Sequence, residues 1–368
     1  MTMKKLIALL TLLCLGLTGL ALAEEPPLGP GWNLDNTFDA YLDGQNIDPM
    51  DLETLWVGAR TTEDDVAAVA DAGFEVFRLP VSWHDHVSGD DFAIDPAWMD
   101  RVQEVADWAL ARGMTLILNS HHDIDQRFFY PDSEHYDQSE RYLTAIWAQI
   151  CERFGGYDDK VIFEFMNEPR LKDTAMEWAF AEHTPACVDA ADCIGRLTQR
   201  CVDVVRASGG NNATRWLMVT PYAASPYSVQ TDHFRLPDDP AGRLIVSVHT
   251  YTPYAFTLKP NGVRRFDPTK PYQVNEINKV LDIVCDKYVS RGIPVYIGEF
   301  GCVDRDNLED RVAYMQYFCA TARARGIYMC VWDNNMYKQG NEWFGLLNRA
   351  TAEWYFPEVV QAMIEASK

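Results

Sequence analysis

The feature that most constrains the fold of this chain is a short, β-rich apolar run that recurs eight times, each time followed by an amphipathic stretch. Glycines suited to the position just after a helix, such as Gly73 and Gly113, close several of these stretches. The runs are almost continuously apolar, which is typical of parallel strands buried on both faces. Eight alternating units predict the α/β class and a single (β/α)8 TIM barrel.

The predicted strands are spread over the whole chain, and the predicted helices lie between them. The strands are GWNLD from Gly31, FEVFRLP from Phe74, MTLILNSHH from Met114, VIFEFMNEP from Val161, RWLMVTPY from Arg215, RLIVSVHTY from Arg243, PVYIGEFG from Pro294 and IYMCVWDNN from Ile327. Helices are expected from Thr62, Asp95, Gln273 and Asn307, and a last one from Thr351 onward closes the barrel. No Pro/Thr/Ser linker, low-complexity tract or repeat marks a second module, so residues 24–368 are expected to form one domain.

Residues 1–23 have the features of a secretory signal peptide. Lys4 and Lys5 precede an apolar run that extends from Leu6 to Leu20, and three small or apolar residues, 21–23, come before the expected cleavage site. The run is barely long enough to span a membrane, and no stop-transfer charges follow it. We expect cleavage after Ala23, secretion, and a mature chain without membrane attachment.

The charge of the chain limits its partners. It carries 54 acidic and 32 basic residues, a formal net charge of −22, which becomes −24 when the two lysines of the signal peptide are removed. This excess argues against nucleic acid and anionic membranes as partners and is typical of a well-solvated surface. We expect a monomer.

The cysteines do not predict a structural metal site. Eight remain after signal cleavage, with no CxxC motif and no Cys/His spacing typical of zinc. Cys187 and Cys193 lie close together in a polar segment and could pair in an oxidising compartment. Four others are expected as free thiols in the core: Cys201, Cys285, Cys319 and Cys330.

Polar side chains stand at the C-terminal ends of the predicted strands, where barrel enzymes have their active sites. A single Arg or His in such a place is usually a hydrogen-bonded structural residue, but here six strands contribute to one rim. These residues are Arg78, His121, Asn167, Glu168, His249, Tyr251, Glu299 and Trp332.

Two of these residues are glutamates on opposite sides of the predicted barrel. Glycoside cleavage needs one carboxylic acid to protonate the leaving oxygen and a second carboxylate at the anomeric carbon, and Glu168 and Glu299 satisfy that need. Either one alone could belong to a structural salt bridge. The pair on one rim favours catalysis.

The motifs around these glutamates resemble those of a known family. Asn167-Glu168-Pro169 and the IGEFG segment at 297–301 are similar to the two signatures of glycoside hydrolase family 5, the cellulase family. Further segments resemble its subfamily 4 in order along nearly the whole mature chain: GWNLDN at 31, FRLPVSW at 77, HHD at 121, NEPRL at 167, GGNN at 209, VSVHTYTPY at 246 and VWDNN at 331. The resemblance implies a retaining endo-β-1,4-glucanase that acts on β-glucan without a cofactor or metal. The lack of a linker in the sequence predicts that there is no separate carbohydrate-binding module.

The resemblance also implies roles for individual residues. Glu168 would be the general acid/base and Glu299 the nucleophile, while Asn167 would hold the 2-hydroxyl of the sugar. Arg78 would keep Glu299 ionised at a low pKa, and Tyr251 would contact Glu299. Four further residues would contact the substrate or the carboxylates: His121, His122, His249 and Trp332.

The choice of substrate is expected to depend on aromatic residues in the loops, because sugar faces pack on aromatic rings. Candidate platforms are Trp56, Trp83, Trp178, Tyr254, Phe256 and Trp343, of which Trp83 and Trp343 are favoured because they follow strand ends. Core packing is at least as common a role for each. The resemblance admits cellulose derivatives, mixed-linkage glucan, xyloglucan and xylan, and we rank β-1,4-glucan first and xyloglucan second.

Two residues depart from the subfamily pattern, and two other functions compete with the glycosidase. Asp35 and Asn335 stand where the subfamily commonly has Gly, and an extra carboxylate at the rim could alter local pKa values.

A metal-dependent hydrolase could use His121, His122, Asp123 and His249. Residues 121 and 122 would point to opposite faces of a strand, however, unless the strand ends there. A non-catalytic glycan-binding barrel would normally have lost one of the two glutamates.

Overall fold

The structure is a computed structural model that describes residues 25–338, 340 and 342–368. The predicted signal peptide, residues 1–23, lies outside the described residues. Among the helices that are described, none is both long enough and apolar enough to cross a membrane.

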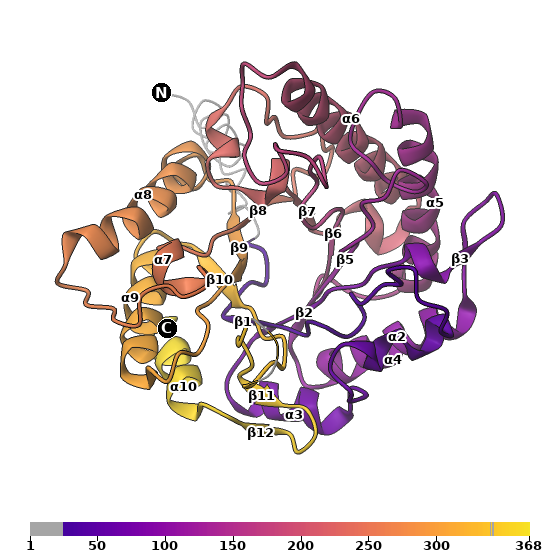
Figure 1. Cartoon of the computed structure of the whole chain (residues 1–368). Helices are drawn as coiled ribbons and strands as arrows, with labels where there is room; N and C mark the ends of the chain where they lie inside the picture. The colour runs from indigo at the N-terminus through magenta and orange to yellow at the C-terminus, as the bar shows by residue number, and fades with distance from the viewer. Residues whose placement is uncertain (1–24, 339, 341) are drawn as a thin grey trace, which may run out of the picture.

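Eight parallel strands close into a barrel, which confirms the predicted (β/α)8 fold. Their order around the barrel is β1-β10-β9-β8-β7-β6-β5-β2. Figure 1 shows the ring of strands surrounded by helices. The strands are β1 (Gly31–Asn33), β2 (Val76–Leu79), β5 (Thr115–Asn119), β6 (Val161–Glu164), β7 (Leu217–Val219), β8 (Leu244–His249), β9 (Val295–Phe300) and β10 (Tyr328–Val331). Each lies within the run predicted for it.

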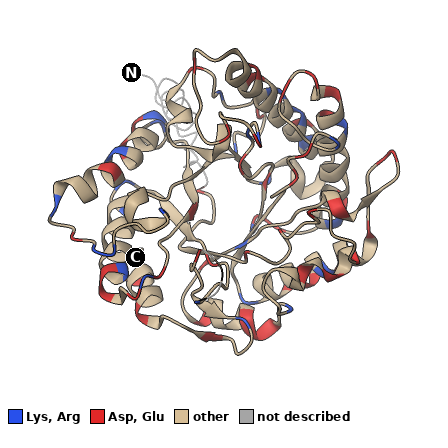
Figure 2. Ribbon diagram, in the orientation of Figure 1, with Lys and Arg blue, Asp and Glu red and all other residues tan. Residues whose placement is uncertain are grey.

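Helices follow the strands on the outside of the barrel. They are α3 (Glu63–Asp71), α4 (Pro96–Ala111), α5 (Tyr136–Phe154), α6 (Pro185–Ala207), α8 (Pro271–Lys287), α9 (Leu308–Arg323) and α10 (Pro357–Ala366), with the short α2 (Leu52–Leu55) and α7 (Tyr254–Thr257) in loops. Thr62 begins α3 through a reciprocal capping box with Asp65. Asp95 caps α4 by accepting from the backbone N–H of Ala97. Acidic and basic residues are interspersed along these outer helices in Figure 2.

The predicted last helix begins later than expected. Residues 347–348 (β11, Leu347–Asn348) and 353–354 (β12, Glu353–Trp354) form a short antiparallel ladder, and α10 starts only at Pro357. Proline favours the first turn of a helix because its missing N–H is not needed there. The hairpin of β3 (Val87–Ser88) and β4 (Ala93–Ile94) was not predicted, since two-residue strands give no periodic signal.

The apolar core has two parts separated by the barrel wall. One lies between the strands and the outer helices, and the other fills the lower barrel with Val76, Ile117, Ile162, Trp216, Met218, Ile245, Tyr296 and Cys330. Successive inward positions on a strand are two residues apart. On β2, β5 and β6 the next inward residues are therefore Arg78, Asn119 and Glu164, so the upper barrel is polar.

The pairing of Cys187 with Cys193 that the sequence left open is not formed. The eight cysteines among the described residues are all free. Cys187 and Cys193 lie six residues apart on α6, a rise of about 9 Å along the axis, and a disulfide needs Cα atoms within about 7 Å. The expected core thiols Cys201, Cys319 and Cys330 are buried, and Cys285 is half-buried.

Candidate active site

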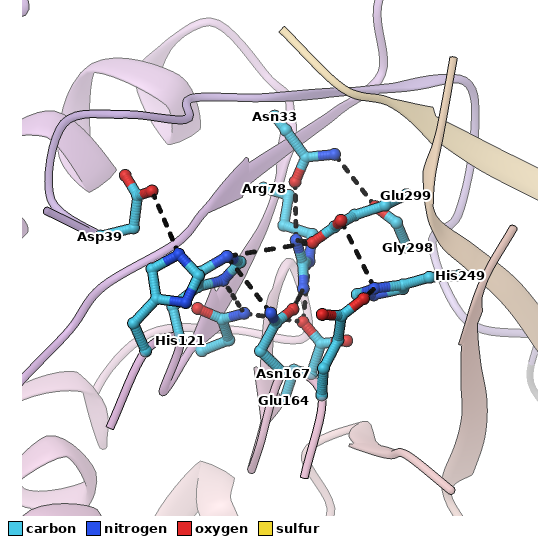
Figure 3. Close-up of polar contacts among 12 residues, drawn as sticks. Asn33, Asp39, Arg78, His121, Glu164, Asn167, His249, Gly298 and Glu299 are labelled. Atoms are coloured by element: carbon cyan, nitrogen blue, oxygen red, sulfur yellow. Dashed lines mark hydrogen bonds and ion pairs between the residues drawn. The ribbon is translucent and has the colours of Figure 1, made fainter. Parts of the chain in front are cut away.

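Arg78 lies at the centre of the polar upper barrel. Its guanidinium is fully buried and donates to four side chains. The acceptors are Glu164 (2.8 Å), Asn33 (2.8 Å), Asn167 (2.7 Å) and Glu299 (3.1 Å). Figure 3 shows these groups converging on Arg78: Asn33 comes from β1, Glu299 from β9, and Glu164 and Asn167 from β6 and the residues that follow it. Arg78 therefore fixes the positions of both Asn167 and Glu299.

Glu164 is a part of this network that the sequence did not reveal. The carboxylate is fully buried and accepts from Arg78, from the hydroxyl of Ser247 (2.6 Å) and from the amide of Asn119 (3.2 Å). The sequence did contain a signal for a buried charge: Glu164 is a charged residue within an apolar strand, and it lies two residues after Ile162, so both side chains point into the barrel. Glu164 balances the charge of Arg78 inside the barrel.

Glu299 reaches the interior because β9 is irregular. The register with β8 shifts between Val248 and His249, which places His249 opposite Glu299. Gly298 makes this approach possible, since a Cβ at that position would lie 2.9 Å from Ser247 Oγ and 2.9 Å from His249 Nε2. Tyr251, which follows β8, donates its hydroxyl to Glu299 Oε2 at 3.0 Å. The expected contact between Tyr251 and Glu299 is thus present.

His249 connects the two glutamates of the rim. Its Nδ1 lies 2.9 Å from Glu168 Oε1 and 3.5 Å from Glu299 Oε2. An oxygen of Glu168 and an oxygen of Glu299 lie within 4.8 Å of each other. Arg170 also approaches Glu168, at 3.7 Å from its carboxylate. Two carboxylates and a histidine from three different strands therefore share one small space.

Burial and charge shift the pKa values of these groups in different directions. Burial opposes ionisation of Glu168, but the hydrogen bond and charge of His249 lower its pKa. Burial also disfavours the charged form of His249, yet Glu299 and Glu168 together raise its pKa. The pKa of Glu299 is raised, because burial outweighs the charges of His249 and Arg78.

The expectation that Arg78 gives Glu299 a low pKa is therefore wrong. The main physical reason is burial, which outweighs the charge of Arg78; Arg78 also lies closer to Glu164 (2.8 Å) than to Glu299 (3.1 Å). A cation that is already paired lowers the pKa of a second carboxyl less than a free cation would.

The remaining predicted rim residues also lie at this site. His121 contacts the amides of Asn119 (3.1 Å) and Asn167 (3.3 Å), and the Trp332 ring stacks on its imidazole with centroids 5.8 Å apart. Burial lowers the pKa of His122 to about 4 despite the Asp39 carboxylate 3.9 Å away. Burial also holds the pKa of His121 well below its usual value, so both imidazoles are neutral near neutral pH.

Two of the predicted sugar platforms are wrong. Trp83 is fully buried in the core, and its Nε1–H donates to the carbonyl of Asn119. Phe256 is also buried, against the rings of Phe266 and Tyr314. A residue that follows a strand end can turn back into the core, and the sequence does not encode that turn.

The other aromatic candidates stay predictions. Trp343 is half-buried and donates to the carbonyl of Gly340. Trp56 is half-buried beside the His122 ring. Trp178 is 61% exposed, with the Arg170 guanidinium 4.0 Å from its ring centre, and Tyr254 is 50% exposed.

The set of residues considered for a metal does not come together as a whole. β5 ends at Asn119, so His121 and His122 follow the strand, and strand alternation does not separate them. Their ring centroids are 4.5 Å apart. Asp123 instead accepts from the backbone of Trp83 and from His84.

Among the described residues, two groups place possible ligand atoms within 4.8 Å of one another: Asp39, His121 and His122, and Glu168, His249 and Glu299. In the first group, both ring nitrogens of His121 already contact the amides of Asn119 and Asn167. In the second, a hydrogen bond joins His249 to Glu168. We assign no metal to either group.

The two departures from the subfamily pattern have different structural consequences. Asn335 has a φ of 54°, a left-handed conformation that asparagine tolerates better than most residues, so it replaces glycine at little cost. Asp35 places a carboxyl group in the interior, 1% exposed.

Comparison with known proteins agrees with this site. The family described as Cellulase (glycosyl hydrolase family 5) matches residues 40–338. The chain is 40% identical to Endoglucanase 1 of Ruminococcus albus over 334 residues, which cover 90% of this chain and 77% of that protein.

Solved structures give the same result. A family 5 lichenase from Caldicellulosiruptor sp. F32 superposes with a TM-score of 0.91 at 44% identity, covering 92% of this chain and 93% of the other. A GH5-4 broad specificity endoglucanase from Ruminococcus champanellensis, with bound cellotriose, gives 0.85 at 39% identity, covering 91% and 95%. The chain therefore belongs to glycosyl hydrolase family 5, the cellulase family, and is a glycoside hydrolase of the endoglucanase type.

Proposed function

We propose that the protein hydrolyses internal β-1,4 bonds of glucans with retention of configuration, using Glu299 as nucleophile and Glu168 as general acid/base. The observation that carries the proposal is the short separation of the two carboxyl groups, with oxygens within 4.8 Å. Retaining glycosidases keep their carboxyl groups about 5–5.5 Å apart, whereas inverting enzymes need about 6.5–9.5 Å to admit a water molecule. The geometry supports direct attack by a carboxylate.

The reaction would proceed in two displacements. Glu299 attacks the anomeric carbon while Glu168 protonates the departing glycosidic oxygen, which leaves a glycosyl ester on Glu299. Glu168, now a base, removes a proton from water, which attacks the same carbon and releases Glu299. Tyr251 and Arg78, which contact Glu299, would orient it for both steps. Asn167, held by Arg78, would bind the 2-hydroxyl.

Replacing the nucleophile tests the mechanism. Glu299→Gln should lower kcat on carboxymethylcellulose by at least about 10³-fold, because the amide cannot form the ester. Glu182→Gln, which changes an exposed glutamate before α6, serves as control and should keep wild-type activity. NMR of the first products should show the β-anomer. Unchanged activity in Glu299→Gln, or an initial α-anomer, would disprove the proposal.

For the substrate, we propose open β-1,4-glucan first, with xyloglucan second and mixed-linkage glucan or xylan as further alternatives. Similarity to a lichenase and to a broad specificity endoglucanase supports activity on more than one glucan. Reducing-sugar release from carboxymethylcellulose, barley β-glucan, xyloglucan, xylan and mannan would rank them. Cleavage of mannan alone would refute the proposed specificity.

We further propose that residues 1–23 are removed on secretion and that residues 24–368 act as a single catalytic domain and as a monomer. The sequence of the first 23 residues supports secretion. The mass of the protein recovered from culture medium tests cleavage after Ala23, and light scattering on a sizing column tests the monomer. A mass that includes the leader, or a dimer at working concentration, would contradict these points.

A further inference from the structure

Asp35 is a buried carboxyl group without a cationic partner. It follows β1, is 1% exposed, and no side chain donates a hydrogen bond to either of its carboxylate oxygens. The backbone N–H of Asn36 lowers the pKa of Asp35, but less than burial, Asp39 and Glu299 raise it. Within the described part of the chain it forms no ion pair. An ionised carboxylate in such a place loses its hydration without compensation, which costs more than accepting a proton. The surroundings therefore favour the neutral acid.

The neighbour that faces Asp35 is another carboxyl group. After burial, the charge of Asp39 and a hydrogen bond between the two side chains are what raise the pKa of Asp35. Asp39 Oδ1 accepts from the backbone N–H of Thr37 at 2.7 Å, but Oδ2 is buried and has no donor. Two carboxylates can only accept, so the contact needs one proton between them. A protonated Asp35 would donate to the otherwise unpaired oxygen of Asp39.

The charged groups around this pair offer Asp35 no cation. Glu299, from β9, adds a negative charge that raises the pKa of Asp35, after burial and Asp39. Tyr251, from the end of β8, is a neutral phenol whose pKa burial and Glu299 raise well above its usual value. His122, from the end of β5, is neutral and faces Asp39.

Arg349, which follows β11, is a cation beside Asp35, but its hydrogen bonds go to backbone carbonyls and not to the Asp35 carboxyl group. Its Nη1 donates to the backbone carbonyl of Asp35, and its Nη2 donates to the backbone carbonyl of Asp333. It also lies over the ring of Trp32, 5.3 Å from the ring centre. The carboxyl group of Asp35 is therefore left to share a proton with Asp39.

We propose that Asp35 is a positioning residue of the active site, a carboxylic acid that stays protonated at neutral pH and donates its hydrogen bond to Asp39. Its proton holds the segment after β1 in place and keeps a further negative charge away from Glu299. Ionisation at alkaline pH breaks this hydrogen bond and sets two like charges side by side. The link to activity rests on the proposed role of Glu299.

Asp35→Asn is the decisive variant because the amide can donate to Asp39 but cannot ionise. The matched control is Asp90→Asn, which changes an exposed aspartate in the turn between β3 and β4. All samples contain EDTA, so that a bound cation cannot replace the proton. Infrared spectra at neutral pH should show a carboxylic-acid C=O band in the wild type and in Asp90→Asn that is absent from Asp35→Asn. A band of equal strength in Asp35→Asn would overturn the proposal.

Thermal unfolding gives a second measure that does not depend on activity. The raised pKa of Asp35 means that its contribution to stability is fully present below the unfolded value of 3.8 and is lost as the pH rises through the folded value. The Tm of Asp35→Asn should therefore rise relative to wild type as the pH increases. A difference that stays constant with pH would overturn the proposal.

The coupling to the reaction is tested by kcat/KM. The ratio of Asp35→Asn to wild type should increase from acidic to alkaline buffers, whereas Asp35→Leu, which cannot donate, should lose activity at every pH. A flat ratio would overturn the coupling. The infrared and Tm results hold whichever residue is the nucleophile, so failure of the glycosidase mechanism in Glu299→Gln would be seen separately.

Discussion

His249 joins the two glutamates of the site, and this contact links stability to pH. The raised pKa of His249 means that its stabilising charge is fully present below the unfolded value of 6.5 and is lost as the pH rises through the folded value. We expect the Tm of wild type to exceed that of His249→Asn most at mildly acidic pH, and the gap to narrow as the pH rises. The exposed His183→Asn is the control. A gap that is independent of pH would show that His249 is neutral in the folded protein.

Glu168 allows a chemical test of its proposed role as acid/base. Glu168→Gln should lower kcat on glucan by about 10²–10⁴-fold, because the amide cannot donate a proton to the leaving group. An aryl glycoside with an activated leaving group does not need that proton, and azide does not need a base. With such a substrate, azide should accelerate turnover by Glu168→Gln and give a β-glycosyl azide. Glu182→Gln is the control and should stay active on glucan. If Glu168→Gln forms no glycosyl azide, the general acid/base is a different residue.

At the scale of the element, β9 is shaped by one small residue. Gly298→Ala would place a methyl group 2.9 Å from Ser247 Oγ and from His249 Nε2. We expect a loss of about 1–3 kcal/mol in the free energy of unfolding, with lower kcat because His249 is displaced from the glutamates.

Gly195→Ala on α6 is the matched control, since no atom lies within 4 Å of the added Cβ. In a helix interior this change should stabilise by about 0.5–1 kcal/mol. Urea denaturation and kcat, measured on both variants, test whether Gly298 is needed for the close approach of β9 to Ser247 and His249. Equal effects of the two substitutions would mean that Gly298 is not needed for the close approach.

The other elements show how far sequence patterns reach. All eight strands and the starts of α3 and α4 were predictable, because apolar runs and capping residues act locally. The start of α10 was not, since the ladder of β11 and β12 that precedes it is held by pairing rather than by periodicity. Trp83 was misjudged for a related reason: its indole turns inward to donate to Asn119.

At the scale of the whole molecule, buried ion pairs inside the barrel stabilise the fold. Glu164→Gln should lower the free energy of unfolding by about 3 kcal/mol, since it breaks a buried pair with Arg78. It also leaves Arg78 free to interact mainly with Glu299. The pKa of Glu299 should then fall, and the acidic limb of the kcat/KM profile should move to lower pH.

Glu53→Gln provides the matched control because Glu53 forms a similar buried pair with Arg101, at 2.7 Å, remote from the rim. It should destabilise the protein to a comparable extent without moving the acidic limb. If both variants shift the profile equally, the shift reports stability rather than the charge of Arg78.

The sequence by itself determined the eight-fold alternation, and with it the barrel, because the hydrophobic effect acts on local periodicity. It also determined which polar residues stand at strand ends, and hence the rim of Glu168, His249 and Glu299. Tertiary structure alone decided the pairing of Arg78 with Glu164, the contact of Asp35 with Asp39 and the resulting pKa values. These contacts and pKa values depend on distances of a few ångströms, either between residues far apart in the chain or between residues that a loop turns toward each other. They also depend on burial from water. No local sequence pattern encodes either.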